Sequence, residues 1–511
     1  MKKTLSLCLS GLAALAFAGP LTGRPKLVVA IAVDQFRYDY LTRYRSEYSA
    51  GLKRLLTQGA VFTNARYQHF PTVTAIGHST FLTGATPSMS GIIGNEWYER
   101  ESSAIVTSVS DDATTIVGGR GGKGSSPRRL LVSTLGDELK IVSPGSRIIG
   151  VSLKDRAAIL PAGHMADGAY WFDNKSGRFV SSSYYFAQPP SWVVDFNQVH
   201  PGDHFAGMKW LDHTMPSDPQ KLYESLAASP FGNELVESFA ERALQSAQLG
   251  TRDTTDVLTV SFSSNDYAGH RFGPDSAEVH EMCIRTDKLL GKFFDFLDAR
   301  VGAGNYLLAF TSDHGVAPLP QTNEARKMPG GRLPAATVRD AIEKGLAGKF
   351  GAGSWVRAFV EQSAYLNQDL IAEKKLDPAE VERTAAQAAM KVPHVFRVFT
   401  RTEMLRGAAM EEQVARLVQN GFYPRRSADV VVLLEPYWLM TTPTSTTGTN
   451  HSTTFSYDAH VPVILMGPGI SAGRYYANIT PNDIAPTLAT MLDVETPSGS
   501  VGRVLGEILQ K

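Results

Sequence analysis

Short apolar runs that end in polar residues dominate the hydrophobic pattern of this chain. Six of them lie at 27–33, 148–153, 257–262, 307–310, 430–434 and 461–466. Runs that are apolar at nearly every position are typical of strands buried on both faces, as in a mostly parallel sheet. The pattern therefore predicts a central sheet covered on both sides.

Helical periodicity appears between these runs. Apolar residues recur at three- and four-residue spacing in 233–249, 278–301, 336–349, 377–391 and 481–492. The alternation of strands and helices predicts an α/β fold, with a mostly parallel central sheet flanked by helices. Two segments are expected as inserted cap segments. One, at about 161–218, is rich in aromatic residues, and the other, at about 318–425, is mostly helical.

The N-terminal segment has the layout of a secretory signal peptide. Lys2 and Lys3 precede an apolar run, and residues 16–18 (Ala-Phe-Ala) form a small-x-small cleavage site. We expect cleavage after Ala18, residues 19–511 as the mature domain, and a periplasmic or secreted location. No later stretch of the sequence is long and apolar enough to predict a membrane span.

Composition and charge exclude several classes of protein. Lys and Arg number 50 and Asp and Glu number 50, so the chain lacks the basic surface of a nucleic-acid-binding protein. The two cysteines are Cys8 and Cys283, too few for a disulfide scaffold or a cysteine-based zinc site. Cys283 lies on the apolar side of an expected helix, where a buried structural thiol is the natural interpretation.

Aspartate and histidine residues follow the predicted strands. In an open α/β sheet, ligands bind beyond the carboxyl ends of the strands. One sheet edge is therefore expected to gather three carboxylates and three imidazoles, which are those of Asp34, Asp266, His270, Asp313, His314 and His451. Taken singly, each aspartate would be interpreted as a turn or cap residue. Together, carboxylate and imidazole ligands suit zinc, and six of them suit a pair of ions roughly 4 Å apart.

A second motif supplies a hydroxyl group. The segment 71–84 (PTVTAIGHSTFLTG) predicts a turn that leads into a helix, with Thr72 and Thr74 near its start. A hydroxyl at a helix N-terminus near a metal can be deprotonated and used as a nucleophile. The alternative role for either threonine is that of a helix N-cap.

Read in order, the motifs resemble those of the alkaline phosphatase superfamily, in the branch shared with nucleotide pyrophosphatases and phosphodiesterases. They are D-Q, T-x-T-x-x-G-H-x-x-x-x-T-G, G-I-I-G-N-E-W-Y, S-L-K-D-R, N-D-Y-x-G-H-x-x-G-P, S-D-H-G and H-S-x-x-x-x-Y-D-x-x-V-P. The resemblance runs from Pro25 to about Leu505, and is closest to the secreted bacterial alkaline phosphatases of the PafA and PhoK type. The Asp-Ser-Ala nucleophile motif of other phosphatases is absent, as is the sulfatase motif Cys/Ser-x-Pro-x-Arg, which disfavours a sulfatase.

This resemblance implies how the ligands divide between two zinc ions per chain. One ion would be bound by Asp34, Asp313 and His314. The other would be bound by Asp266, His270 and His451. Two further histidines, His78 and His460, are set aside as structural residues.

The resemblance also implies the catalytic residues. Thr74 rather than Thr72 would be the nucleophile, because the family nucleophile lies three residues before the G-H pair. Asn95 would donate its amide to a phosphoryl oxygen. Lys154 and Arg156 would contact the phosphoryl group from outside the metal pair, although alone they would be interpreted as an exposed charged turn.

The charges of this site favour a phosphate monoester. Two zinc ions carry four positive charges and three aspartates carry three negative ones, which leaves one positive charge. A Thr74 alkoxide would cancel that charge. Lys154 and Arg156 then give the site a net charge of two positive units. A monoester is a dianion near neutral pH because its second pKa is ~6. A diester carries one charge and has a second organic group where Lys154 and Arg156 would sit.

We therefore expect a secreted, zinc-dependent alkaline phosphatase that hydrolyses small phosphate monoesters through a phosphothreonine intermediate, as a monomer. The enzymatic alternative is a phosphodiesterase or nucleotide pyrophosphatase of the same superfamily. The non-enzymatic alternative is an exported metal- or phosphate-binding protein without turnover.

Overall fold

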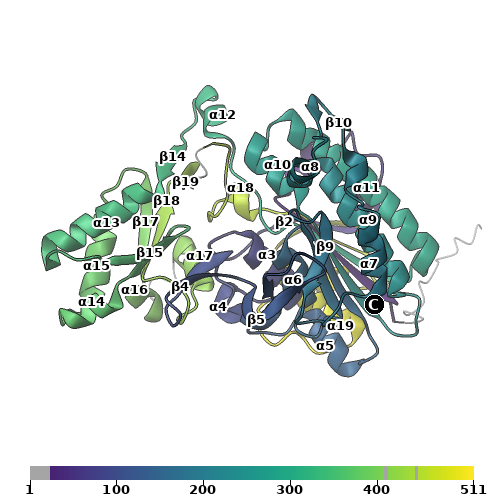
Figure 1. Cartoon of the computed structure of the whole chain (residues 1–511), viewed down its shortest axis with the longest axis horizontal. Helices are drawn as coiled ribbons and strands as arrows, with labels where there is room; N and C mark the ends of the chain where they lie inside the picture. The colour runs from purple at the N-terminus through teal and green to yellow at the C-terminus, as the bar shows by residue number, and fades with distance from the viewer. Residues whose placement is uncertain (1–23, 408–411, 443–446, 511) are drawn as a thin grey trace, which may run out of the picture.

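The structure is a computed structural model that describes residues 24–407, 412–442 and 447–510. It has two lobes, a larger one built on a long sheet and a smaller one to its left in Figure 1. The expected signal peptide, residues 1–18, lies outside the described residues. Among the helices of the described ranges, none combines the length and the apolar character that a bilayer span requires.

Eleven strands form the sheet of the larger lobe. In spatial order they are β21 (Gly473–Ile479), β2 (Ala60–Ala65), β20 (Val463–Met466), β13 (Tyr306–Thr311), β1 (Leu27–Val33), β12 (Asp256–Phe262), β7 (Ile148–Ser152), β8 (Gly168–Asp173), β9 (Arg178–Ser182), β5 (Ser110–Val117) and β6 (Lys123–Ser125). The central strands from β13 to β8 are parallel to one another. Antiparallel pairs lie at β20 and beyond β8, so the whole sheet is mixed. The predicted α/β class is confirmed.

Burial on both faces explains why the central strands are apolar at every position. All residues of β1 are buried. Leu27, Val29 and Ile31 pack into one hydrophobic core, whereas Val28 and Ala30 pack into a second core on the opposite face. A strand with two buried faces has no position at which a polar side chain reaches water.

Helices cover the two faces of this sheet (Figure 1). One face carries α2 (Gly51–Gln58), α7 (Ser191–Gln198), α8 (Pro219–Leu226), α9 (Pro230–Ser246) and α11 (Ala277–Leu297). The other carries α3 (Thr74–Thr83), α5 (Leu135–Val142), α6 (Asp155–Ala162) and α19 (Ile484–Leu492). Shorter elements lie in the connections: α1 (Tyr40–Arg43), α4 (Pro87–Ser90), α10 (Ser264–Phe272), α18 (Ser456–Ala459) and the hairpins β3 (Glu96–Glu99) with β4 (Ala104–Thr107) and β10 (Lys209–Trp210) with β11 (His213–Thr214).

The smaller lobe, here called the cap lobe, comprises the described residues between 331 and 441. Its antiparallel sheet has the order β15 (Val356–Val360), β16 (Ser363–Leu366), β18 (Val430–Leu434) and β17 (Val395–Thr400). Its helices are α13 (Ala335–Phe350), α14 (Gln368–Glu373), α15 (Pro378–Ala389), α16 (Arg401–Leu405) and α17 (Gln413–Gly421). The lobe follows α12 (Pro320–Ala325) and is closed off by the paired strands β14 (Gly331–Pro334) and β19 (Trp438–Thr441).

The segment at 318–425 consists largely of the helices α12 to α17, as expected, but it also contains the short strands β15, β16 and β17, which were not expected. These strands are 5, 4 and 6 residues long. Such short strands show no clear two-residue alternation of apolar and polar positions, and the helical period of the two long neighbouring helices dominates the pattern. The apolar run 430–434 forms β18, which pairs in the cap sheet rather than in the central sheet. The expected helices at 336–349 and 377–391 are confirmed as α13 and α15.

The direction of β20 decides what reaches the site. This strand runs antiparallel to both of its neighbours, β13 and β2, in a sheet that was expected to be mostly parallel. It therefore begins at the edge where the parallel strands end. The loop that precedes β20, which carries His451 and α18, therefore lies at the carboxyl edge of the sheet.

Asp287 of α11 stabilises the start of α2. Its carboxylate is buried and accepts hydrogen bonds from the backbone N–H groups of Ser49, Ala50, Leu52 and Lys53 at 2.8, 2.9, 2.8 and 3.2 Å. We expect Asp287→Ala to lower the free energy of unfolding by about 3 kcal/mol, because it leaves helix donors unpaired away from water. Urea unfolding followed by circular dichroism measures this loss.

Asp295→Ala is the matched control, since Asp295 is an exposed aspartate on the same helix. Its effect should stay within about 0.5 kcal/mol. Equal losses in the two variants would contradict the capping role of Asp287.

Candidate active site

Four neighbouring parallel strands supply the polar side chains of the site. In the order β13, β1, β12, β7, their carboxyl ends lead to Asp313, Asp34, Asp266 and Lys154. The strands are in register, with Val33 opposite Phe262 at the end of the β1–β12 pair. Because parallel strands end at the same edge, residues more than 200 positions apart in the sequence become neighbours there.

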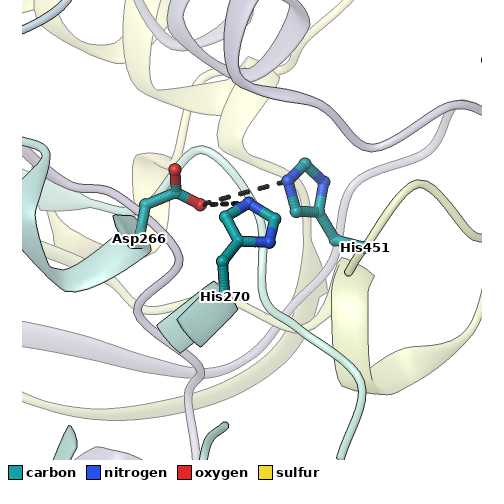
Figure 2. A group of neighbouring side chains, drawn as sticks. All are labelled: Asp266, His270 and His451. Carbon is teal, nitrogen blue, oxygen red and sulfur yellow. Dashed lines mark ion pairs between the residues drawn. The ribbon is translucent and has the colours of Figure 1, made fainter. Parts of the chain in front are cut away.

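The first group of possible metal ligands is Asp266, His270 and His451 (Figure 2). Asp266 and His270 are one turn apart on α10, so both side chains lie on the same face of the helix. The Nε2 atoms of His270 and His451 lie 3.1 and 4.0 Å from Oδ1 of Asp266. Ligand atoms of all three residues lie within 4.8 Å of one another.

The second group contains Asp34, Asp313 and His78, all fully buried. Nε2 of His78 lies 3.3 Å from Oδ1 of Asp34, and its Nδ1 lies 3.5 Å from Oδ2 of Asp313. His78, which was not assigned as a ligand from the sequence, thus lies between two of the predicted ligand carboxylates. The signal that was available is its spacing from Thr74, since residues i and i+4 share one face of a helix.

His314 joins the two groups. Its Nε2 lies 3.2 Å from Oδ2 of Asp313 in the second group. Its ring stacks on that of His451 in the first group, with the ring centroids 3.5 Å apart. His460, by contrast, lies outside the site, where its ring stacks on Tyr38 and its Nε2 contacts the carbonyl oxygen of Thr63.

Backbone carbonyl groups orient three of the histidines. The Nδ1 atoms of His270, His314 and His451 lie 2.8, 2.9 and 2.7 Å from the carbonyl oxygens of Thr449, Gly315 and Thr72. A carbonyl oxygen can only accept, so Nδ1 carries the proton. In the neutral ring, Nε2 then carries the lone pair, as a metal ligand requires.

Lys154 makes contact with both groups. Its ammonium Nζ lies 3.1 Å from Oδ2 of Asp34 and 2.6 Å from Oδ2 of Asp266. Burial would raise the pKa of both carboxyls, but the Lys154 charge and the adjacent imidazoles hold those pKa values well below the usual range. Both carboxylates are therefore ionised at any physiological pH.

Thr74 is the first residue of α3 and is buried beside these groups. Its Oγ1 lies 3.4 Å from Nε2 of His314. The N-cap position is occupied by Val73, so the Thr74 hydroxyl is not used to cap the helix. Thr72 is directed elsewhere, because its hydroxyl donates to the carbonyl oxygen of Thr453 at 3.0 Å.

Gly77 lets α3 approach the ligands closely. A β-carbon at this position would collide with the backbone carbonyl oxygen of Asp313. Any larger residue would push Thr74, one turn earlier, away from Asp313. The T-x-x-G-H motif thus requires glycine at this position because no side chain fits there.

Asn95 contacts the residue after Thr74, and Arg156 belongs to a helix that packs against α3. Oδ1 of Asn95 accepts a hydrogen bond from the backbone N–H of Ala75 at 2.9 Å, which leaves its amide N–H₂ free to donate. Arg156 is in the first turn of α6, which packs against α3. Its buried Nε has no hydrogen-bond partner within the described residues.

The donor set of the two groups fits a pair of zinc ions. It consists of carboxylate oxygens and imidazole nitrogens, the ligands that zinc takes in the absence of cysteine. Oδ2 of Asp313 is buried and accepts no hydrogen bond from the described residues. A buried charged oxygen without a donor is costly unless a cation meets it. A mixed sheet that carries such a site beside a buried hydroxyl defines a metal-dependent hydrolase.

Comparisons with known proteins give the family. The model of the type I phosphodiesterase / nucleotide pyrophosphatase family matches residues 28–458. The alkaline phosphatase PhoV of Synechococcus elongatus is 36% identical, over 95% of this chain and 93% of that protein. The alkaline phosphatase PafA of Elizabethkingia meningoseptica is also 36% identical, over 95% of both chains.

A crystal structure of alkaline phosphatase PafA superposes with a TM-score of 0.89, covering 96% of this chain and 100% of that one. The chain belongs to the type I phosphodiesterase / nucleotide pyrophosphatase family. The resemblance inferred from the motifs is thereby confirmed.

Proposed function

We propose that this protein is an alkaline phosphatase that hydrolyses phosphate monoesters through a phosphothreonine intermediate on Thr74. The observation that carries the proposal is the position of the Thr74 hydroxyl, 3.4 Å from Nε2 of His314 at the junction of two ligand groups. The catalytic unit is proposed to comprise residues 19–511, acting as a periplasmic or secreted monomer on small substrates.

Two zinc ions would be held by the carboxylates and imidazoles of the site. Asp34, Asp313 and His314 would hold one ion. Asp266, His270 and His451 would hold the other. When bound, the ions would lower the pKa of a hydroxyl group and neutralise charge on the phosphoryl and leaving-group oxygens.

Thr74 is proposed to attack phosphorus in line with the leaving group. A bond forms between Oγ1 and phosphorus while the bond to the leaving oxygen breaks. The hydroxyl of Thr74 loses its proton and the leaving oxygen gains one, so the leaving group departs as an alcohol. Water then attacks the phosphothreonine, which releases inorganic phosphate and restores the hydroxyl. The N-terminus of α3, which begins at Thr74, favours the negative charge that develops there.

Three side chains are proposed to meet the equatorial oxygens. Asn95 donates its amide, which the bond from the Ala75 N–H already orients. Arg156 can clamp two oxygens with its planar guanidinium, whereas Lys154 acts as a point charge. Because Asn95 is held by the Ala75 N–H before the substrate binds, its amide needs little reorganisation as charge develops.

Lys154 and Arg156 support the choice of a monoester over a diester. We expect the double variant Lys154→Ala, Arg156→Ala to lose about 10³-fold in kcat/KM for p-nitrophenyl phosphate, since two charge-assisted contacts are removed. The loss for bis-p-nitrophenyl phosphate should be at least about tenfold smaller, because the diester has one charge fewer to be met. Steady-state rates on the two substrates measure the difference.

The same pair of substrates tests the proposed function in the unmodified protein. A rate on the monoester well above that on the diester is expected. Faster diester hydrolysis would instead assign the phosphodiesterase or nucleotide pyrophosphatase activity. Binding of either compound without turnover would assign a binding protein.

A further inference from the structure

A two-residue turn of the cap lobe contacts two loops of the site. Glu361 and Gln362 connect β15 to β16, at the end of the cap sheet that approaches the larger lobe. Glu361 has φ 52, in the left-handed region. Turns of this kind favour asparagine or glycine, so a glutamate here points to a use for its side chain.

Glu361 contacts the loop that carries Asn95. Its Oε1 accepts a hydrogen bond from the backbone N–H of Asn95 at 3.3 Å. Burial raises the pKa of Glu361 to about 7, while the Asn95 N–H and the nearby Arg156 charge oppose the rise. A partly buried carboxyl group thus lies next to two residues proposed to bind the phosphoryl group.

Gln362 contacts the loop that carries His451. Its side-chain Nε2 donates to the carbonyl oxygen of Ser452, the residue after His451, at 2.8 Å. The carbonyl oxygen of Gln362 accepts from the N–H of Val432 at 2.9 Å, which ties the turn to the cap sheet. Ser452 has φ 90, so its peptide is held in a conformation that a serine rarely adopts.

We infer that the turn Glu361–Gln362 is a positioning element, through which the cap lobe fixes the Asn95 and His451 loops of the active site. This inference rests on the proposed function, because it takes Asn95 as a phosphoryl donor and His451 as a metal ligand. The two contacts reach two different loops of the site, and both come from one hairpin of the cap lobe. The cap lobe thereby helps to hold Asn95 and His451 in the positions that catalysis requires.

A double-mutant cycle tests the Asn95 side of the turn. Glu361→Ala should lower kcat/KM for p-nitrophenyl phosphate by about 10-fold, and Glu361→Gln should recover most of the loss because its amide oxygen can accept the same bond. On an Asn95→Ala background, Glu361→Ala should cost less than about 2-fold. An equal loss on both backgrounds, or no recovery by glutamine, would overturn this half of the inference.

Release of zinc tests the His451 side without any substrate. Zinc-loaded Gln362→Ala should transfer one of its two ions to a chromogenic chelator about 10-fold faster than the unmodified protein, since the peptide after His451 loses its support. Arg357→Ala is the matched control, because Arg357 is an exposed residue of β15 whose guanidinium pairs with Asp369 at 3.0 Å, and the release rate of this variant should be unchanged. Unchanged release from Gln362→Ala, or faster release from both variants, would overturn this half.

Failure of the proposed function would look different. An unmodified protein that binds no zinc, or an Asn95→Ala variant with full activity, would contradict the roles given to His451 or Asn95 themselves. Loss of the coupling with those roles intact would contradict only the role of the turn.

Discussion

Thr74→Ala should lose on the order of 10⁴-fold or more in kcat for phosphate monoesters, because the attacking oxygen is removed. The covalent intermediate should vanish with it. Acid quenching during turnover, followed by intact-protein mass spectrometry, should show a phosphorylated chain in the unmodified protein and none in the variant. The fold should survive, since Thr74 does not cap α3 and alanine is a good helix former.

Two further threonine variants make this result specific. Thr74→Ser keeps a hydroxyl in place and should still form a phosphorylated chain. Thr72→Ala should also form it, though more slowly, because the bond from Thr72 to the carbonyl oxygen of Thr453 is lost near the His451 loop. A phosphorylated Thr74→Ala chain, or its loss in Thr72→Ala, would move the nucleophile away from Thr74.

Removal of divalent metal should abolish hydrolysis, and added zinc should restore it. Catalysis in this class depends on cations that offset the charge of the phosphoryl group, an effect worth several kcal/mol. Elemental analysis should give two zinc ions per chain for the active protein. The metal-free protein should also melt at a lower temperature, because Asp34, Asp313 and Asp266 are buried charges that a bound cation would stabilise.

Histidine variants assign the two ions to their groups. His270→Ala should reduce the zinc content from two ions to one, since a three-residue group then lacks a ligand. His460→Ala should keep both ions, because His460 lies outside the site, against Tyr38 and Thr63. Full activity of the metal-free protein would refute the two-metal site. Loss of zinc from His460→Ala would contradict the placement of His460 outside that site.

The central strands could be predicted from the sequence because each is buried on both faces. β1, β7, β12 and β13 lie within a residue or two of the expected apolar runs. The cap-lobe strands β15, β16 and β17 could not, because they are short and flanked by helices with a stronger period. The direction of β20 could not be predicted either, because a parallel and an antiparallel strand buried on both faces have the same apolar pattern.

Much of the candidate site was within reach of the sequence for a related reason. Asp34, Asp266 and Asp313 follow strands whose parallel order brings their ends together. The place of His78 was missed, although its spacing of four residues from Thr74 puts the two side chains on one face of a helix. Glu361 was missed because its partner Asn95 is 266 positions away in the chain, and no local pattern records such a contact.

The sequence by itself determined the α/β class, the strands that end in acidic residues and the motif set of the family. These properties depend on local periodicity and on residue type, which a chain displays before it folds. Only the tertiary structure decided that His78 lies between two aspartates, that Lys154 contacts both ligand groups and that a turn of the cap lobe touches two loops of the site. Each of these depends on how separate elements pack, and packing is a property of the whole chain rather than of any segment.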